Sequence, residues 1–142
     1  MKVRFGIYIG TSSASIAKME AGEVRIYRTD TQRDSIPLCV MVTKKGLIVG
    51  DKAHSQLPKD KKKAFIDQSF QTNVFIEFTR TLGTDIRFSS SNATRCFSSE
   101  ELLAEIIKIL ISFVDDENVE AAIITVPASF EMNQINAVKK AG

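Results

Sequence analysis

Hydrophobic and polar residues alternate in three short stretches at the start of the chain. They read VRFGIYIG at 3–10, ASIAKME at 14–20 and VRIYR at 24–28. Alternation with a period of two is typical of strands that have one buried face. Short turns separate the stretches, TSS at 11–13 and AGE at 21–23, so the pattern predicts an antiparallel meander.

A second hairpin is indicated by LCVMV at 38–42 and LIVG at 47–50, with Gly46 at its turn. The next part of the chain gives weaker signals. DKAHSQLP at 51–58 predicts a helical turn that ends at Pro58. The basic run KDKKKAF at 59–65 is typical of a solvated helix face, and an anion-binding patch is the alternative.

NVFIEFTRTLG at 73–83 fits a strand or a helix, and Gly83 is a suitable end for either. A polar stretch at 85–97 follows, and its end is expected to be a strand.

The signal is clearer after residue 97. Ser98 and Glu101 form the pattern of a capping box, and apolar residues then recur at helical spacing through Val114, which predicts a helix over 99–114. The polar run DDEN at 115–118 ends this helix as a solvated loop. The continuous apolar run AAIITVP predicts a strand at 121–126 that is buried on both faces.

A second helix follows in ASFEMNQINAVKKAG. The order is therefore three strands, an insertion, a helix, a strand and a helix, which is typical of an α/β unit. We expect the strands at 3–10, 14–20, 23–29 and 121–126 to form one mixed sheet, with the 99–114 helix packed on it.

Composition agrees with an ordinary globular protein: 142 residues, 44% hydrophobic, 25% charged and a net charge of +2. That charge is too small to indicate a nucleic-acid partner. The most apolar helix is interrupted by Glu105 and Lys108, so no membrane partner is expected either. Without an apolar leader, a cytoplasmic protein is the expectation.

Metal and cysteine chemistry are poorly supported. His54 is the only histidine, and Cys39 and Cys96 lie far apart, which excludes a zinc site of common spacing. Two buried or half-buried free thiols are the simplest interpretation.

The turn at Gly10, Thr11, Ser12 and Ser13 is the best candidate for binding phosphate. A glycine lets a ligand approach the backbone, and successive N–H groups and hydroxyls suit phosphate oxygens. A plain hairpin turn explains the same residues. Gly6, Tyr8 and Gly10 share one strand face, so a bulky tyrosine stands between two positions without side chains.

Several stretches, taken in order, resemble the seventy-kilodalton heat-shock chaperones of the DnaK type. FGIYIGTSSAS at 5–15 resembles their G-I-D-L-G-T-T opening, and SIPLCVMV at 35–42 their proline loop and strand. Four later blocks follow in the same order. The first two are LIVGDKA, which resembles their V-G-x-x-A, and NVFIEFTRTLG, which resembles their N-x-x-x-x-x-K-R-x-x-G. The last two are FSSEELLAEIIKIL, which resembles their capped helix, and AAIITVPASFEMNQINAVKKAG, which resembles their A-V-I-T-V-P-A-Y-F block. The ordered set is more specific than any single block.

This resemblance implies an actin-like ATPase fold, of the ribonuclease H-like class, of which the chain would form lobe I only. Residues 1–37 and 117–142 would form its base, and 38–116 an inserted α+β upper subdomain. ATP or ADP with Mg²⁺ would be the ligand. Unfolded client proteins and co-chaperones would be the partners, through domains absent from this sequence, in protein folding under stress.

The resemblance also identifies replaced positions. Tyr8 stands where the family has an aspartate near the metal ions, and a neutral phenol cannot replace a carboxylate at a hard cation. Thr79 replaces a lysine that helps the attacking water, Ile135 an arginine that couples nucleotide state to the chaperone, and Ser129 a tyrosine. No catalytic residue is intact, no metal ligand is identified, and Tyr8 is interpreted as a space-filling side chain.

The sequence leaves two functions open. One is a chaperone ATPase lobe that still binds nucleotide through residues 10–13. The other is a degenerate, non-catalytic actin-like domain used for protein interaction or regulation. A sugar kinase or a bacterial cytoskeletal actin is a weaker third possibility, because the V-G-x-x-A and R-x-x-G blocks argue against it.

Overall fold

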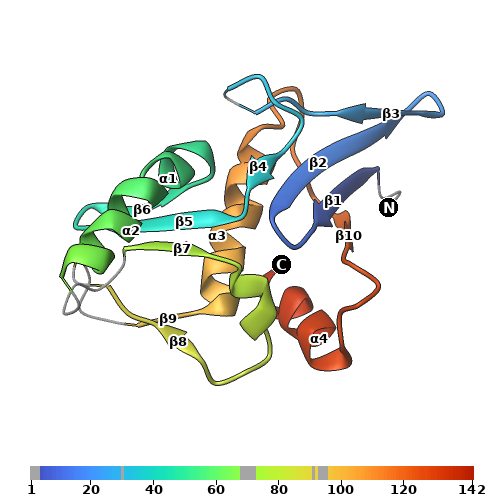
Figure 1. Cartoon of the computed structure of the whole chain (residues 1–142). Coiled ribbons are helices and arrows are strands. Elements are labelled where there is room, and N and C mark those ends of the chain that lie inside the picture. Colours follow the sequence, from blue (N-terminus) through green and yellow to red (C-terminus); the bar gives the residue numbers. More distant parts are fainter. Residues whose placement is uncertain (1–3, 30, 68–72, 91, 93–95) are drawn as a thin grey trace.

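A computed structural model describes residues 4–29, 31–67, 73–90, 92 and 96–142. It is a mixed α/β structure with two main sheets on either side of a central helix (Figure 1). The first sheet has the strand order β10-β1-β2-β3, with β4 paired to β2. Its strands are β1 (Phe5–Ile9), β2 (Ser13–Glu20), β3 (Glu23–Ile26), β4 (Ile36–Pro37) and β10 (Ala122–Thr125).

The predicted mixed sheet is confirmed. β1 pairs with β10 in parallel and with β2 in antiparallel fashion, and β2 pairs with β3 antiparallel. The chain from β2 to α3 (Ser99–Ser112) forms the connection between β1 and β10. A parallel pair needs such a crossover, because a short turn cannot reverse the direction twice.

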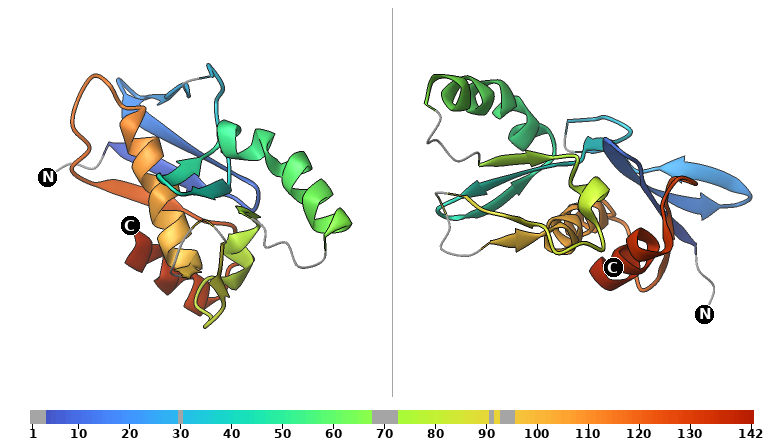
Figure 2. Two further views of the ribbon diagram at one scale, coloured as in Figure 1. Left: turned by 90° about the vertical axis from the view of Figure 1, so that its left-hand side faces the viewer. Right: turned by 60° about the horizontal axis from the view of Figure 1, so that its bottom comes forward.

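The helix α3 (Ser99–Ser112) lies between the two sheets and contacts β2, β5 and β6 (Figures 1 and 2). Its capping box is formed as predicted: the Glu101 amide donates to Ser98 Oγ, and the Ser98 amide donates to Glu101 Oε1. Its buried apolar residues follow helical spacing: Leu102, Leu103, Ile106, Ile107 and Leu110.

One continuous hydrophobic core draws on both sheets. From the first sheet it takes Phe5, Ile7 and Ile9, which alternate with the exposed face of β1 as predicted. From the second sheet it takes Val40 and Val42. Because α3 supplies side chains to both, the two sheets share a core through this helix.

β10 differs from its prediction. The apolar run was expected to be buried on both faces, but the burial of β10 alternates, and Ile123 is 63% exposed. Within the described residues β10 pairs only with β1, so it is an edge strand of the first sheet, and the face that carries Ile123 and Thr125 is exposed. The composition of the run could not show this, since an apolar run looks the same whether or not its second face is covered.

The second sheet has the order β6-β5-β7. β5 (Cys39–Thr43) and β6 (Gly46–Val49) form the predicted hairpin, and β7 (Val74–Ile76) pairs with the other edge of β5. The helices α1 (Asp51–Ser55) and α2 (Leu57–Ile66) follow the hairpin. A small second cluster, which includes Cys39, Ala53 and Val74, has Leu57 packed against it.

Pro58 does not end a helix, contrary to the prediction. It lies in the first turn of α2, where its missing amide proton costs no helical hydrogen bond. The basic run therefore lies within α2, with exposed Lys61 and Lys62, as expected of a solvated helix face.

The stretch at 73–83 contains both a strand and a helical segment. β7 is followed by the 3₁₀ helix η1 (Phe78–Thr81), and Glu77 between them has a positive φ of 57°. A two-residue ladder of β8 (Arg87–Phe88) and β9 (Phe97–Ser98) precedes α3. The part of the polar stretch at 91 and 93–95 lies outside the described residues. α4 (Met132–Ala141) packs against α3.

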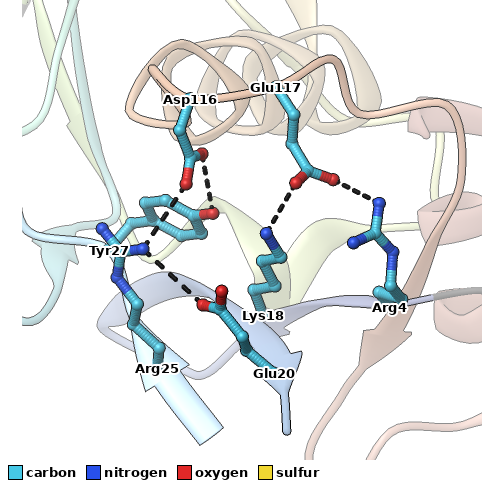
Figure 3. A network of polar contacts seen from close by, with 7 residues as sticks. All are labelled: Arg4, Lys18, Glu20, Arg25, Tyr27, Asp116 and Glu117. Atoms are coloured by element: carbon cyan, nitrogen blue, oxygen red, sulfur yellow. Dashed lines mark hydrogen bonds and ion pairs between the residues drawn. The ribbon is translucent and has the colours of Figure 1, made fainter.

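Two side chains of the loop after α3 bind residues of the first sheet (Figure 3). Glu117 accepts from Lys18 Nζ at 2.6 Å and also pairs with Arg4, while Asp116 accepts from the Tyr27 hydroxyl at 3.0 Å. The Asp116 carboxylate also lies 3.4 Å from Arg25. The loop is largely exposed, as predicted, with Glu117 half-buried. Its pairing with residues of the first sheet was not predicted, because those partners lie far away in sequence.

The cysteines also depart in part from expectation. Cys39 is buried, as predicted, whereas Cys96 is exposed. No helix in the described part of the chain is long and apolar enough to cross a membrane.

Candidate functional site

The candidate phosphate site lies in the tight turn between β1 and β2. The Gly10 amide donates to the Ser13 carbonyl at 2.8 Å, and the Leu38 amide donates to the Ser12 carbonyl at 2.9 Å. These bonds fix the turn from inside and from the neighbouring β4 region. Thr11 and Ser12 are exposed, while Gly10 is buried and Ser13 half-buried. The two hydroxyls at the tip can therefore be reached from solvent.

Tyr8 stands beside this turn and lies against it. A Cβ added to Gly10 would lie 3.1 Å from both Cε1 and Oη of Tyr8, and 3.0 Å from the Ser13 carbonyl oxygen. The tyrosine ring thus covers one side of Gly10. Tyr8 is 46% exposed, so it is not a core residue. Its ring instead fills the space next to Gly10.

The other replaced positions lie on two elements that are joined to each other. Thr79 is buried in η1, and its carbonyl accepts from Gln134 Nε2 in α4 at 3.1 Å. Ile135 is the next residue of α4 and is half-buried. Register places Tyr8 opposite Thr125 of β10, two residues before Pro127. A hydrogen bond therefore links η1, which carries Thr79, to α4, which carries Ile135. Strand pairing separately links β1, which carries Tyr8, to β10.

Gln134 is a residue that the sequence did not single out. Its side-chain oxygen accepts from the Glu131 amide at 2.9 Å, and its nitrogen donates to Thr79. One amide side chain therefore both caps α4 and attaches η1 to it. The spacing of Glu131 and Gln134 resembles a capping box and was a usable signal for the first role. Nothing local in sequence pointed to the second.

The oxygen atoms at the turn do not suit a magnesium ion. Mg²⁺ prefers carboxylate, phosphate and water oxygens in octahedral geometry, whereas the turn offers neutral hydroxyls and the Tyr8 phenol. No group of three or more histidine, cysteine, aspartate or glutamate side chains suited to a metal occurs within the described ranges. The turn residues can donate hydrogen bonds to an anion, although they do not suit a metal ion.

A separate open cavity of about 790 Å³ is formed by the loop after η1, the start of α3 and α4. Gly83, Glu100 and Asn133 are among its lining residues, and the Gly83 amide donates to Glu100 Oε1. None of the turn residues lines it, so it is not the phosphate candidate.

Comparison with known proteins decides the family. The family model described as "Hsp70 protein" matches residues 4–142. The chain belongs to the Hsp70 family. The resemblance inferred from the ordered sequence blocks is therefore confirmed at the level of the family.

Curated Hsp70 relatives agree with this assignment. The chain is 30% identical to "Chaperone protein dnaK1" of Prochlorococcus marinus strain MIT 9313 over 96% of the chain and 23% of that protein. It is 27% identical to "Heat shock 70 kDa protein 6, chloroplastic" of Arabidopsis thaliana, with 96% and 21% covered. It is also 27% identical to "Chaperone protein HscA homolog" of Shewanella amazonensis, with 99% and 25% covered. The chain spans about a quarter of the length of these Hsp70 relatives.

Proposed function

We propose that the chain is the N-terminal part of the ATPase domain of an Hsp70-type chaperone. In this proposal it forms lobe I of an actin-like fold, with residues 1–37 and 117–142 as the base and 38–116 as the inserted upper subdomain. The family match over residues 4–142 and the mixed first sheet support it. The uncovered outer face of β10 is consistent with a piece that packs against further protein.

We further propose that this lobe does not hydrolyse ATP and binds it weakly at best. The observation that supports this most directly is Tyr8, whose ring lies against Gly10 and puts a neutral phenol beside the phosphate turn. Phosphoryl transfer needs metal ions and cationic groups that balance developing charge. Losing one well-placed electrostatic group costs on the order of 3 kcal/mol of barrier, so replacements at both Tyr8 and Thr79 leave little catalysis.

Calorimetric titration with Mg-ATP and a phosphate-release assay test the proposal, on this chain and on the full-length gene product. We expect weak or no binding and no turnover in the chain. Micromolar binding with turnover in the chain alone would refute the proposal. Turnover confined to the full-length product would show that other residues replace Tyr8 and Thr79.

A pair of variants tests the role of Tyr8. Tyr8→Asp removes the ring from Gly10 and supplies a carboxylate, so we expect Mg-ATP to bind more tightly than to the parent chain. Tyr8→Phe keeps the ring and serves as the matched control, for which we expect no gain. Equal affinity of both variants would show that Tyr8 does not limit binding.

The second candidate is a degenerate domain that is kept for protein contacts. The outer face of the first sheet favours it. Register places Ile123, Gly6, Ala17 and Ile26 in one row across β10, β1, β2 and β3. Ile123 and Ile26 are exposed, as are Met19 and Val24 in the next row. Exposed apolar side chains that gather on one face of a sheet are typical of contact surfaces.

Absence of nucleotide binding in both the chain and the full-length product would favour the second candidate. For the longer protein we propose ATP or ADP as the nucleotide, unfolded proteins and co-chaperones as partners, and the cytoplasm as location. The family supports the chaperone role.

A further inference from the structure

α2 carries an unusual combination of exposed side chains at the edge of the molecule. It lies at the side of the structure away from the first sheet (Figures 1 and 2). Phe65 is 90% exposed and Ile66 is 72% exposed, both at its C-terminal end. Large apolar side chains that stand this far into solvent are costly unless something covers them.

Lysines precede these two apolar residues along α2, and the exposed Asp67 follows them. Lys59, Lys61 and Lys62 are exposed, and no ion pair joins them to a carboxylate within the described residues. Lys61 lies four residues before Phe65, and Lys62 four residues before Ile66. Residues at this spacing are neighbours on a helix surface, so each apolar side chain has an ammonium group one turn away.

The one acidic residue of α2 does not offset this charge on the outer surface. Asp60 is buried and accepts from the Asn73 amide at 3.1 Å. Leu57 packs against the small second cluster. The helix is therefore attached through its first turns, while its lysines and its apolar end face outward.

We propose that α2 docks on an anionic lipid surface, with Phe65 and Ile66 entering the headgroup region and the lysines contacting lipid phosphates. Charge complementarity is the first argument, because exposed lysines beside apolar side chains are attracted to acidic lipids. The second argument is shape. A side chain that is 90% exposed stands clear of its own protein, so a flat and deformable surface reaches it without a matching cavity.

Docking through α2 needs no bound nucleotide and no membrane-spanning segment. The sequence predicted no membrane partner because it lacks a spanning segment. Peripheral docking needs no such segment. It needs the exposure of Phe65 and Ile66, which the sequence could not show.

A tryptophan reporter on the full chain gives the direct test. The chain contains no tryptophan, so Phe65→Trp creates a single fluorophore at the proposed contact. On vesicles of phosphatidylcholine and phosphatidylserine in equal parts, we expect its emission to move to shorter wavelength. Pure phosphatidylcholine vesicles should leave it unchanged. Met132→Trp, on an exposed position of α4, is the matched control and should not respond.

Charge variants test the electrostatic part by co-sedimentation with the same vesicles. Lys61→Gln with Lys62→Gln should weaken binding roughly tenfold or more. Lys139→Gln with Lys140→Gln removes the same charge from exposed positions of α4 and should bind like the parent chain. Raised salt should release the parent chain from the vesicles.

Three results would overturn the proposal. They are an unchanged Phe65→Trp spectrum on anionic vesicles, equal binding to neutral vesicles, and equal effects of the two lysine pairs. Polyglutamate and a short RNA serve as competing anions. A response of the reporter to either of these, without one to vesicles, would assign α2 to a protein or nucleic-acid partner instead.

Discussion

Gly83 is the residue whose role depends most on backbone geometry. Its φ is +78°, and an added Cβ would lie 2.6 Å from the Asn133 carbonyl oxygen of α4. Gly22 has a similar φ of +79°, with nothing near its Cβ position. We expect Gly22→Ala to lower the free energy of unfolding by about 1–2 kcal/mol through the left-handed backbone alone. Gly83→Ala should cost a further ~1–3 kcal/mol, because backbone must move.

Urea denaturation of both alanine variants measures this difference. If Gly83→Ala and Gly22→Ala lose equal stability, the close approach of Gly83 to α4 does not matter energetically. The sequence identified Gly83 as the end of an element, but only the structure gives the second reason for a glycine.

The two thiols should react very differently. Burial raises the pKa of Cys39 to about 12, so almost none of it is thiolate near neutral pH, whereas Cys96 is exposed. With a chromogenic disulfide reagent at mildly alkaline pH, we expect one fast thiol in the folded chain and a second only after unfolding. Cys96→Ser should abolish the fast phase. A fast reaction that survives this change would show that Cys39 is accessible.

At the scale of elements, the start of α3 is the clearest case in which local sequence determines structure. Ser98 Oγ accepts from the Glu101 amide at 3.2 Å. Ser98→Ala should lower the free energy of unfolding by about 1 kcal/mol, since an amide at the helix start loses its acceptor. Ser112→Ala, at the exposed other end of α3, is the control and should change stability less. Chemical denaturation checks both, and equal losses would contradict the assigned cap.

The loop after α3 gives a prediction about pH. The hydrogen bond from the Tyr27 hydroxyl holds the pKa of Asp116 below its usual value of 3.8. A lowered native pKa stabilises the fold at pH values above the unfolded one, and this contribution is lost as pH falls through the native value. The parent chain should therefore lose more thermal stability between pH 7 and about pH 3 than Tyr27→Phe.

Tyr8→Phe removes a hydroxyl from an exposed tyrosine and should keep the acid sensitivity of the parent chain. Thermal melting followed by circular dichroism at several pH values compares the three proteins. Parallel acid profiles for the parent chain and Tyr27→Phe would show that the Tyr27–Asp116 bond does not contribute.

Elements with a strong local pattern were predictable, and elements decided by distant contacts were not. The capping box and apolar spacing predicted α3, and alternation predicted β1, without any knowledge of tertiary contacts. The prediction that Pro58 ends a helix was wrong, because proline suits the first turn of a helix as well as the position after its end. The pairing of Glu117 with Lys18 could not be inferred, since 99 positions separate them.

The same distinction applies to the candidate site. Strand alternation placed Tyr8 and Gly10 on one face, but a strand pattern does not determine the direction of a side chain along that face. The contact of the Tyr8 ring with Gly10 could therefore be seen only in the structure. The attachment of η1 to α4 through Gln134 likewise depends on how separate elements pack.

At the scale of the whole molecule, the remaining question is whether residues 38–116 open separately from the base. The shared core argues for coupling, because α3 packs against both sheets. The outer layer of the second sheet is thinner. Among the described residues, the buried cluster on this side of β5 is the small one of Cys39, Ala53 and Val74, and most residues of α2 are exposed. Few buried contacts mean a low free energy of local opening.

We therefore expect native-state hydrogen exchange to show the amides of α1, α2, β5, β6 and β7 opening more readily than those of β1 and β10. The central strand β1 should be the slowest, since it is paired on both sides and its inner face is buried. Ala53→Gly thins the small cluster and should speed exchange in the second sheet more than in β1 and β10. Equal protection throughout, or equal acceleration by Ala53→Gly, would show that the whole chain opens as one unit and would remove the proposed boundary at residue 38.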